Sequence, residues 1–189
     1  MNKGEHLNKE GLIKIVSLKA YLNKGLSENL KINFPNIIGV EKPKVNIPLT
    51  IDLNWIAGFF SGEACFSVCI YKSKTHKTGY GILLQIILSQ HYRDKMLFNS
   101  IKKTLACGNI IKRSTRNIIV LSIYKFEDTY YKMIPLFKEY RIEGIKALDF
   151  QDFVLAAEII KKKDHLTLEG LEEIRKIRSN MNRSRVWLY

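Results

Sequence analysis

Glu63 lies in a stretch whose residues suit a helix that packs closely against another helix. The stretch from Trp55 to Phe66 reads WIAGFFSGEACF, and Gly58 and Gly62 stand four residues apart, so they fall on one helix face. Small residues on that face let a second helix approach. Carboxylate oxygens are the ligands that Mg²⁺ prefers. Glu63 could therefore bind a metal ion, but for Glu63 taken alone the interpretation as an ordinary acid at a helix end dominates.

The helices and strands that would position Glu63 follow one another in a regular order along the chain. We predict a helix over 53–63, strands over 65–72 and 80–89, a helix over 93–105, a hairpin of strands 109–113 and 118–124 turning at 114–117, and helices over 127–139 and 145–161. The order αββαββα predicts an α+β fold, a four-stranded antiparallel sheet with helices on one face.

Strand alternation assigns the two faces of this sheet. The side chains expected toward the helices are Phe66, Val68, Ile70, Ile82, Leu84, Ile86 and Leu88. Those expected on the open face are Ser67, Cys69, Tyr71, Leu83, Gln85, Ile87, Ile111 and Arg113. Basic residues at the rim, expected to meet phosphates, are Lys72, Lys74, Lys77, Lys112 and Arg116.

Charge points to a polyanionic partner. The 189 residues include 31 Lys and Arg against 18 Asp and Glu, a formal net charge of +13, which is typical of nucleic-acid binding. No apolar run reaches the roughly 20 residues of a membrane span, so no membrane partner is expected, and no signal or transit peptide is visible at the start. Three cysteines without a CxxC pair favour reduced, buried thiols over disulfides or zinc.

An internal repeat divides the chain. KGEHLNKEGLIKIVSLKAYLNKG near the start matches KKDHLTLEGLEEIRKIRSNMNRS near the end, with His6 and His165 aligned 159 positions apart. Asn8 and Thr167 are suitable N-cap residues for the helix in each copy. We therefore expect 1–34 to be the tail of a preceding repeat, 35–52 a proline-containing linker, and 53–189 a complete domain.

Residues 56–64, IAGFFSGEA, resemble the nine-residue signature of the LAGLIDADG homing endonucleases. The stretches LSQHYRDKMLF, TLACGNI, KALDFQDF and HLTLEGLEEIRKIRSNMNRSR follow in the family's order, so the likeness spans about residues 50–185. It implies a saddle-shaped sheet and a helix pair in which each signature helix gives one carboxylate to divalent metal ions between the DNA strands. The resemblance thus implies cleavage of double-stranded DNA with Mg²⁺ or another divalent cation.

The resemblance assigns roles by position. It implies metal binding at Glu63 and Ala64, and helix pairing through Ala57, Gly58 and Gly62. It implies further catalytic roles for Gln90, which would order the nucleophilic water, and for Arg93. It also implies a catalytic basic residue near the start of the 145–161 helix, for which Lys146 is the first candidate and Arg141 the second. The expected DNA contacts are Ser67, Tyr71, Lys72, Lys74, Lys77, Gln85, Lys112, Arg113 and Arg116.

Three features depart from the family pattern. Only one signature copy is present, so a second LAGLIDADG domain is expected in cis, in trans or as a homodimer. Ala64 replaces the last glycine of the signature, and its methyl group could disturb the metal geometry. The open face carries apolar or thiol side chains where base-reading polar residues are expected, namely Cys69, Leu83, Ile87 and Ile111.

Three functions remain open at this point. The first is a homing endonuclease half that cuts intron-insertion-site DNA. The second is a maturase that binds group I intron RNA and needs no Glu63. The third is an inert remnant that would expose Ala57, Phe60 and Ala64 on a helix face left without its partner. The family likeness, with a composition rich in Lys, Ile and Asn, implies a mitochondrial, organelle-encoded intron product.

Overall fold

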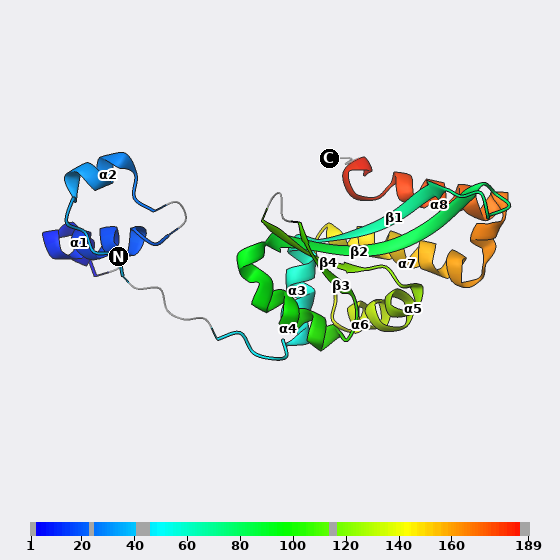
Figure 1. The fold of residues 1–189 in the computed structure, drawn as a ribbon, viewed down its shortest axis with the longest axis horizontal. Helices are drawn as coiled ribbons and strands as arrows, with labels where there is room; N and C mark the ends of the chain where they lie inside the picture. Colours follow the sequence, from blue (N-terminus) through cyan, green and yellow to red (C-terminus); the bar gives the residue numbers. More distant parts are fainter. Residues whose placement is uncertain (1–2, 23–24, 41–45, 114–116, 186–189) are drawn as a thin grey trace. The chain divides into compact units, whose positions relative to one another are not determined.

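A computed structural model of the chain describes residues 3–22, 25–40, 46–113 and 117–185. The chain forms two compact units, residues 1–46 and 47–189 (Figure 1). The interpretation of the first unit as the tail of a preceding repeat stays a prediction. Arg116 and most of the turn of the second hairpin lie outside the described residues. No helix in the described part of the chain is long and apolar enough to cross a membrane.

The first unit contains η1 (Glu5–Leu7), α1 (Lys9–Lys19) and α2 (Glu28–Asn33). Its α1 begins like the last long helix of the second unit, α8 (Leu168–Ser179). The side chain of Asn8 accepts a hydrogen bond from the Gly11 N–H, and that of Thr167 accepts one from the Gly170 N–H. Both predicted N-caps are thus confirmed, and the two repeat copies share one local structure.

The second unit follows the predicted order αββαββα. Its elements are α3 (Leu53–Glu63), β1 (Ala64–Lys72), β2 (Tyr80–His91), η2 (Tyr92–Asp94), α4 (Lys95–Leu105), β3 (Asn109–Arg113), β4 (Ile118–Ile123), α5 (Phe126–Asp128), η4 (Thr129–Met133), α6 (Ile134–Glu139), α7 (Lys146–Lys161), η5 (Asp164–Leu166), α8 and η6 (Asn182–Ser184). The helix predicted over 127–139 is built from α5, a π-helical turn and α6.

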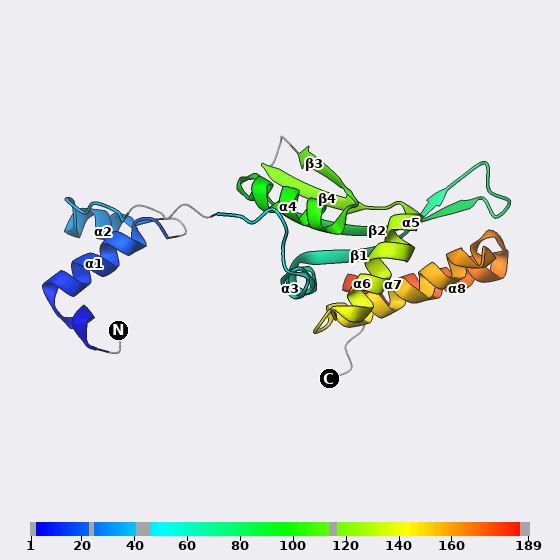
Figure 2. The same ribbon diagram turned by 90° about the horizontal axis from the view of Figure 1, so that it is seen from below.

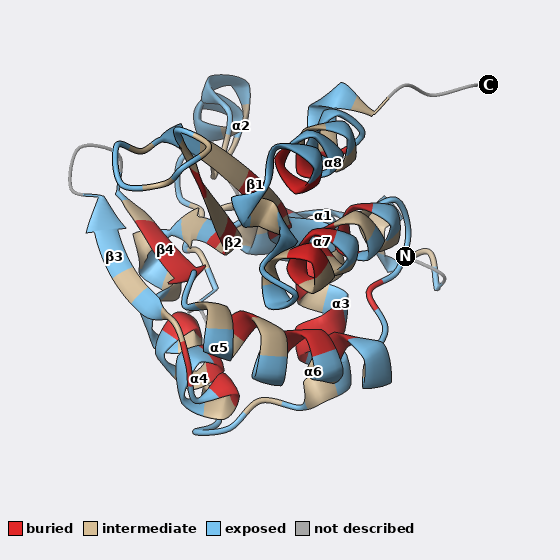
Figure 3. Cartoon of the chain, turned by 90° about the vertical axis from the view of Figure 1, so that its right-hand side faces the viewer, coloured by how far each residue is buried: buried red, intermediate tan, exposed pale blue. Residues whose placement is uncertain are grey.

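The four strands form one antiparallel sheet in the order β1-β2-β4-β3. Phe66, Val68, Leu84, Ile86 and Leu88 are each at most 3% exposed, as predicted for the face that meets the helices. The Phe66 ring contacts phenylalanines of α6 and α7. Figure 2 shows α7 and α8 side by side along one side of the sheet, and Figure 3 shows buried residues on α4, α6, α7 and β4.

A buried carboxylate anchors the C-terminal segment to α7. Asp149 is 3% exposed, and its Oδ1 accepts hydrogen bonds from the Asn182 N–H at 2.9 Å and the Arg185 guanidinium at 3.0 Å. Arg185 also binds Asp152 at 2.6 Å. Asp149→Ala would leave the guanidinium and the Asn182 N–H short of an acceptor.

We expect Asp149→Ala to lower the free energy of unfolding by about 3 kcal/mol, because it breaks a buried ion pair from one side. The measurement is urea denaturation followed by circular dichroism. Asp152→Ala is the matched control; Asp152 makes one of these contacts and is less buried, so a loss near 1 kcal/mol is expected, roughly that of a weaker pair. Equal losses in the two variants would contradict this account.

The three cysteines are free thiols, as predicted, but only Cys107 is buried, while Cys65 and Cys69 are partly exposed. Burial, reinforced by the charge of Asp128, raises the pKa of Cys107 to about 11. At pH 8 roughly one Cys107 in a thousand is then a thiolate. We expect iodoacetamide at pH 8 to alkylate Cys107 last, as followed by peptide mass spectrometry. Alkylation of Cys107 as fast as Cys69 would refute this.

Candidate functional site

Helix α3 carries Glu63 to the point where the first strand begins. Asp52 caps the start of the helix, and its Oδ1 accepts a hydrogen bond from the Trp55 N–H at 2.9 Å. Ile56 and Phe60 are fully buried in the core and fix the rotation of the helix. Glu63 is its last residue and is exposed. Among the described residues its carboxylate has no hydrogen-bond or ion-pair partner, so it is free to bind a ligand.

The opposite face of α3 is open. A Cβ added to Gly58 or Gly62 would meet no atom within 4 Å. Beside these glycines Trp55 is 45% exposed, and its ring stacks on Phe59 with centroids 4.9 Å apart. Small residues next to exposed aromatic rings make a surface of holes and knobs suited to another helix.

One predicted pairing residue does not lie on this open face. Ala57 is 3% exposed and packs in the core with Phe60 and Ala64. The prediction of Ala57 on the pairing face is therefore wrong, and so is the expectation that a single half exposes these three residues. The physical reason is the helical turn of about 100° per residue, which groups residue 57 with 56 and 60 on the inward side.

Ala64 fits without strain where the signature has glycine. Its backbone is extended, with φ −79° and ψ 153°, a conformation that any residue adopts. Its methyl group is 2% exposed and belongs to the core. The substitution therefore does not distort the backbone next to Glu63.

Gln90 lies at the same end of the sheet as Glu63. Ala64 pairs with Leu88 across β1 and β2, and Gln90 follows two residues later. Gln90 pairs in turn with Ile119 of β4. The register thus brings the carboxylate and the amide to neighbouring strand ends.

A serine fastens the loop before α7 to the last turn of α3. The Ser61 hydroxyl donates to the Ala57 carbonyl at 2.7 Å and accepts from the Glu143 N–H at 2.9 Å. Lys146 follows this loop as the first residue of α7, 20% exposed, with Nζ 3.7 Å from Asp149 Oδ2. Ser61 therefore limits how far Lys146 can move from the Glu63 end of α3.

Lys146 lines a cavity together with Arg178 and Arg183. These two arginines were not predicted as site residues from the sequence. The cavity has a volume of about 730 Å³ and lies beside β1, where Cys65 and Ser67 also line it. Burial raises the pKa of the Cys65 thiol, and the positive charge of Lys146 opposes that rise. In the sequence, Arg178 and Arg183 are marked only by the basic residues that recur along the end of the second repeat copy.

The other two basic residues predicted for catalysis, Arg93 and Arg141, are both exposed. Arg93 lies in η2 with an 80% exposed side chain, and its Nε is 4.0 Å from Asp94 Oδ2. Its backbone N–H donates to His91 Nδ1 at 3.1 Å. Arg141 is exposed in the loop before α7. Neither arginine touches Glu63 in the described contacts.

The register places some of the expected DNA contacts on the open face. Ser67 pairs with Gln85, and the Gln85 amide donates to the buried Ser122 hydroxyl at 2.7 Å. Tyr71 is 49% exposed on the same face. Arg113 is exposed at the end of the edge strand, two residues from Ile111, which is 50% exposed. The face is therefore a mixture of polar and apolar side chains, as the sequence predicts.

The rim lysines divide between two locations. Lys74 and Lys77 are exposed in the β1–β2 turn. Lys72 and Lys112 alternate with the open-face residues, so their Cβ atoms point toward the helix side. Lys112 Nζ lies 4.3 Å from the centroid of the Tyr92 ring. These two lysines therefore do not lie on the open face with the other expected DNA contacts.

The residues of this chain fit half of a metal site. In the described ranges no cluster of three or more His, Cys, Asp or Glu side chains could hold a metal ion. Glu63 offers one exposed, unpartnered carboxylate, the donor type that Mg²⁺ and Ca²⁺ take. Among the described residues, Glu63 therefore offers a single carboxylate ligand at this position.

Comparison with known proteins gives a consistent picture. The family model described as LAGLIDADG endonuclease matches residues 56–157. The chain is 35% identical to a probable intron-encoded endonuclease 2 of Neurospora crassa, over 96% of this chain and 41% of the relative. A crystal structure of the I-SmaMI homing endonuclease bound to cleaved DNA matches at 41% identity and a TM-score of 0.94, over 98% of this chain and 62% of that chain.

A further I-SmaMI structure, described as bound to uncleaved target DNA in the presence of calcium ions, matches with a TM-score of 0.92, 41% identity, and coverage of 96% of this chain and 62% of that chain. The chain thus spans less than half of the Neurospora relative and less than two thirds of the I-SmaMI chain. The four-stranded sheet with helices on one face is confirmed as the fold of these nucleases.

Proposed function

The chain belongs to the LAGLIDADG endonuclease family, and from this premise we propose that it is one half of a homing endonuclease that cuts intron-insertion-site DNA. The observation that carries the proposal is the exposed, unpartnered carboxylate of Glu63 at the tip of a helix whose glycine face meets nothing. Such a tip can enter a shared metal site only when a second helix tip lies beside it.

The second half is a second LAGLIDADG domain, supplied in cis, in trans or by another copy of this chain. The open face of α3, with Gly58 and Gly62, is the pairing surface. We propose that residues 1–34 are the tail of a preceding domain, that 35–52 link the two, and that 53–189 are the domain described here. The partial coverage of longer relatives supports this division.

At the paired helix tips, Glu63 would hold Mg²⁺ or another divalent cation, next to Ala64. The ion, when bound, supplies charge stabilisation at the scissile phosphate and an activated water. Gln90 orders the attacking water by hydrogen bonding from the adjacent strand end. Lys146 offsets the negative charge that develops on the phosphate. The loop that Ser61 binds holds Lys146 near the tip of α3. Arg93 contacts the DNA farther from the scissile phosphate.

Double-stranded DNA is the proposed partner of the open face. Ser67, Tyr71, Gln85 and Arg113 meet the duplex from the strands. Lys72, Lys74, Lys77, Lys112 and Arg116 contribute phosphate contacts from the turns and rims. The +13 charge makes such binding strong at low salt.

The same family membership supports an intron-encoded origin, and we extend it to a mitochondrial gene with a group I intron. The relative reported above is named an intron-encoded endonuclease, which supports DNA cleavage over a maturase role in binding intron RNA. The cleavage proposal also explains the exposed Glu63, whereas RNA binding has no need of it.

The test is cleavage of a supercoiled plasmid that carries the intron-insertion site. With Mg²⁺ and a first-half domain present, the chain is expected to linearise or nick the plasmid. Omission of either the metal ion or the first half is expected to leave the plasmid supercoiled. Absence of cutting with every component present would refute the proposal.

A further inference from the structure

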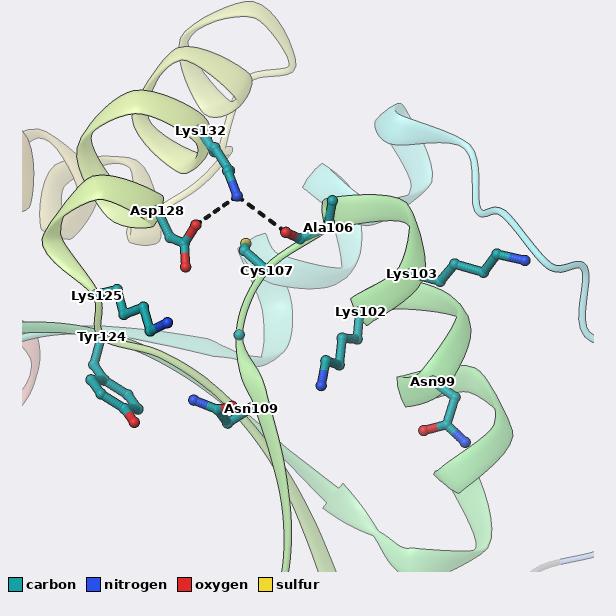
Figure 4. A pocket seen from close by; sticks show the side chains of 11 residues that line it. Asn99, Lys102, Lys103, Ala106, Cys107, Asn109, Tyr124, Lys125, Asp128 and Lys132 are labelled. Carbon is teal, nitrogen blue, oxygen red and sulfur yellow. Dashed lines mark hydrogen bonds and ion pairs between the residues drawn. The ribbon is translucent and has the colours of Figure 1, made fainter.

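A second basic cavity lies at the edge of the sheet, and none of the residues proposed above for DNA contact lines it. It has a volume of about 530 Å³ and lies between the end of α4, the start of β3 and the segment joining β4 to α5 (Figure 4). The residues that determine its charge are Lys102, Lys103, Lys125, Lys132 and Asp128.

The positive charge of this cavity is largely uncompensated. Asp128 is the one carboxylate of its lining, and its Oδ1 is 2.6 Å from Lys132 Nζ. Lys132 also donates to the Ala106 carbonyl at 3.1 Å, so its position is fixed. Lys102, Lys103 and Lys125 have no ion-pair partner among the described residues. Three ammonium groups thus border the cavity without a counter-charge.

Two of these lysines flank a side-chain amide. Figure 4 shows Lys102 and Lys125 on opposite sides of the cavity with the Asn109 amide between the ends of their side chains, while Lys103 points away. Two ammonium groups that border one cavity repel each other, and an anion bound between them attracts both. The amide nitrogen of Asn109 adds a neutral hydrogen-bond donor, so the arrangement suits an anionic oxygen.

The cavity also reaches the open face of the sheet. Asn109 pairs with Ser122 across β3 and β4, so the two side chains project from the same face. The Ser122 hydroxyl accepts the hydrogen bond from Gln85, a proposed DNA contact. A duplex carries a phosphate charge about every 1.7 Å along its axis, so one lying on this face and passing over the β3 edge brings phosphates to the cavity.

We propose that this cavity binds backbone phosphates of the DNA duplex that lies on the open face, with Lys102 and Lys125 as the phosphate-binding residues and Asn109 as a hydrogen-bond donor. The inference rests on the proposed function and extends the DNA contact surface from the strands to the end of α4. The recognised group is a phosphodiester of the backbone, and it carries no sequence information.

Amine-reactive footprinting of the whole chain tests the proposal at single lysines. A 30-base-pair duplex is expected to slow acylation of Lys102 and Lys125 by roughly tenfold at low salt, the regime of strong phosphate binding. Lys138 of α6 and Lys176 of α8, both exposed, are expected to react at unchanged rates. Equal protection by millimolar inorganic phosphate alone would indicate a small-anion site and overturn the proposal.

The salt dependence of duplex binding provides the second measurement. Lys102→Gln with Lys125→Gln is expected to lower the slope of log K against log salt by about 2, close to one for each phosphate that the variant no longer neutralises. The control pair Lys138→Gln with Lys176→Gln removes the same charge and is expected to leave the slope nearly unchanged.

Arg113→Gln separates the two proposals. If Arg113→Gln lowers the slope and the cavity pair does not, the cavity proposal fails while DNA binding by the open face stands. If the chain binds no duplex, the proposed function and the cavity proposal fail together. A decrease in the slope for both variants supports both.

Discussion

Glu63→Gln, assayed with a first-half domain present, is expected to reduce plasmid cleavage by roughly 10³-fold or more, the scale of losing a key charge-stabilising group. The amide keeps the size of the side chain but loses the negative charge that a divalent cation requires. Because Glu63 is exposed and has no partner among the described residues, the substitution breaks no contact of the fold. Stability is therefore expected to stay within about 0.5 kcal/mol, the usual range for surface changes.

Glu63→Gln is expected to lose cleavage without losing affinity for DNA. The carboxylate faces the phosphates of the proposed duplex, so removing its charge removes a repulsion. DNA affinity without metal ions is therefore expected to be unchanged or higher in Glu63→Gln, as measured by fluorescence anisotropy. Loss of cleavage with retained binding is the pattern of a catalytic group.

Glu173→Gln serves as the matched control. Glu173 is an exposed acid on α8, so the variant makes the same chemical change away from the tip of α3. It is expected to cleave like the wild type. If Glu63→Gln also cleaved at the wild-type rate, Glu63 would hold no essential metal ion and the nuclease mechanism proposed here would be wrong.

The elements of the second unit were largely predictable because their signals are local. The helix over 53–63 was found to the residue, since Asp52 caps it and apolar residues recur along one side. The alternation of strands β1 and β2 predicted which side chains are buried. In both cases the period of the hydrophobic residues reports directly on the face that packs.

The errors have a common cause in three-dimensional context. The family resemblance implied Ala57 as a pairing residue, but a position in a sequence motif does not reveal the direction in which the side chain points, and Ala57 is buried in the core. The cavity of Lys102 and Lys125 could not be predicted, because these lysines are 23 positions apart in the sequence and line one cavity only through the packing of α4 against β3 and β4. The π-helical turn within 127–139 likewise has no clear sequence signal.

Gly58→Leu is expected to separate folding from function more sharply than any change in the core. A Cβ at residue 58 meets no atom within 4 Å, so the unit can accept a larger side chain. Replacement of glycine inside a helix also removes conformational freedom from the unfolded chain, which stabilises by about 0.5–1 kcal/mol for alanine. The isolated chain is therefore expected to unfold at an equal or higher urea concentration.

The proposed helix pair responds oppositely to the same substitution. Two helices that approach through glycines have no room for a leucine side chain between them, and forcing one in typically costs about 1–3 kcal/mol. That cost corresponds to a roughly 10- to 100-fold weaker association with the first half. Cleavage should fall with association, since the tip of α3 no longer meets its counterpart.

The control is Gln151→Leu, which adds an exposed leucine to α7 instead. It is expected to leave both association and cleavage unchanged, so it separates pairing at α3 from a general effect of added apolar surface. Association is measured by titrating a labelled first half. Gly58→Leu that pairs and cuts like the wild type would show that the open face of α3 is not the pairing surface, and the metal site would then need its second carboxylate from another direction.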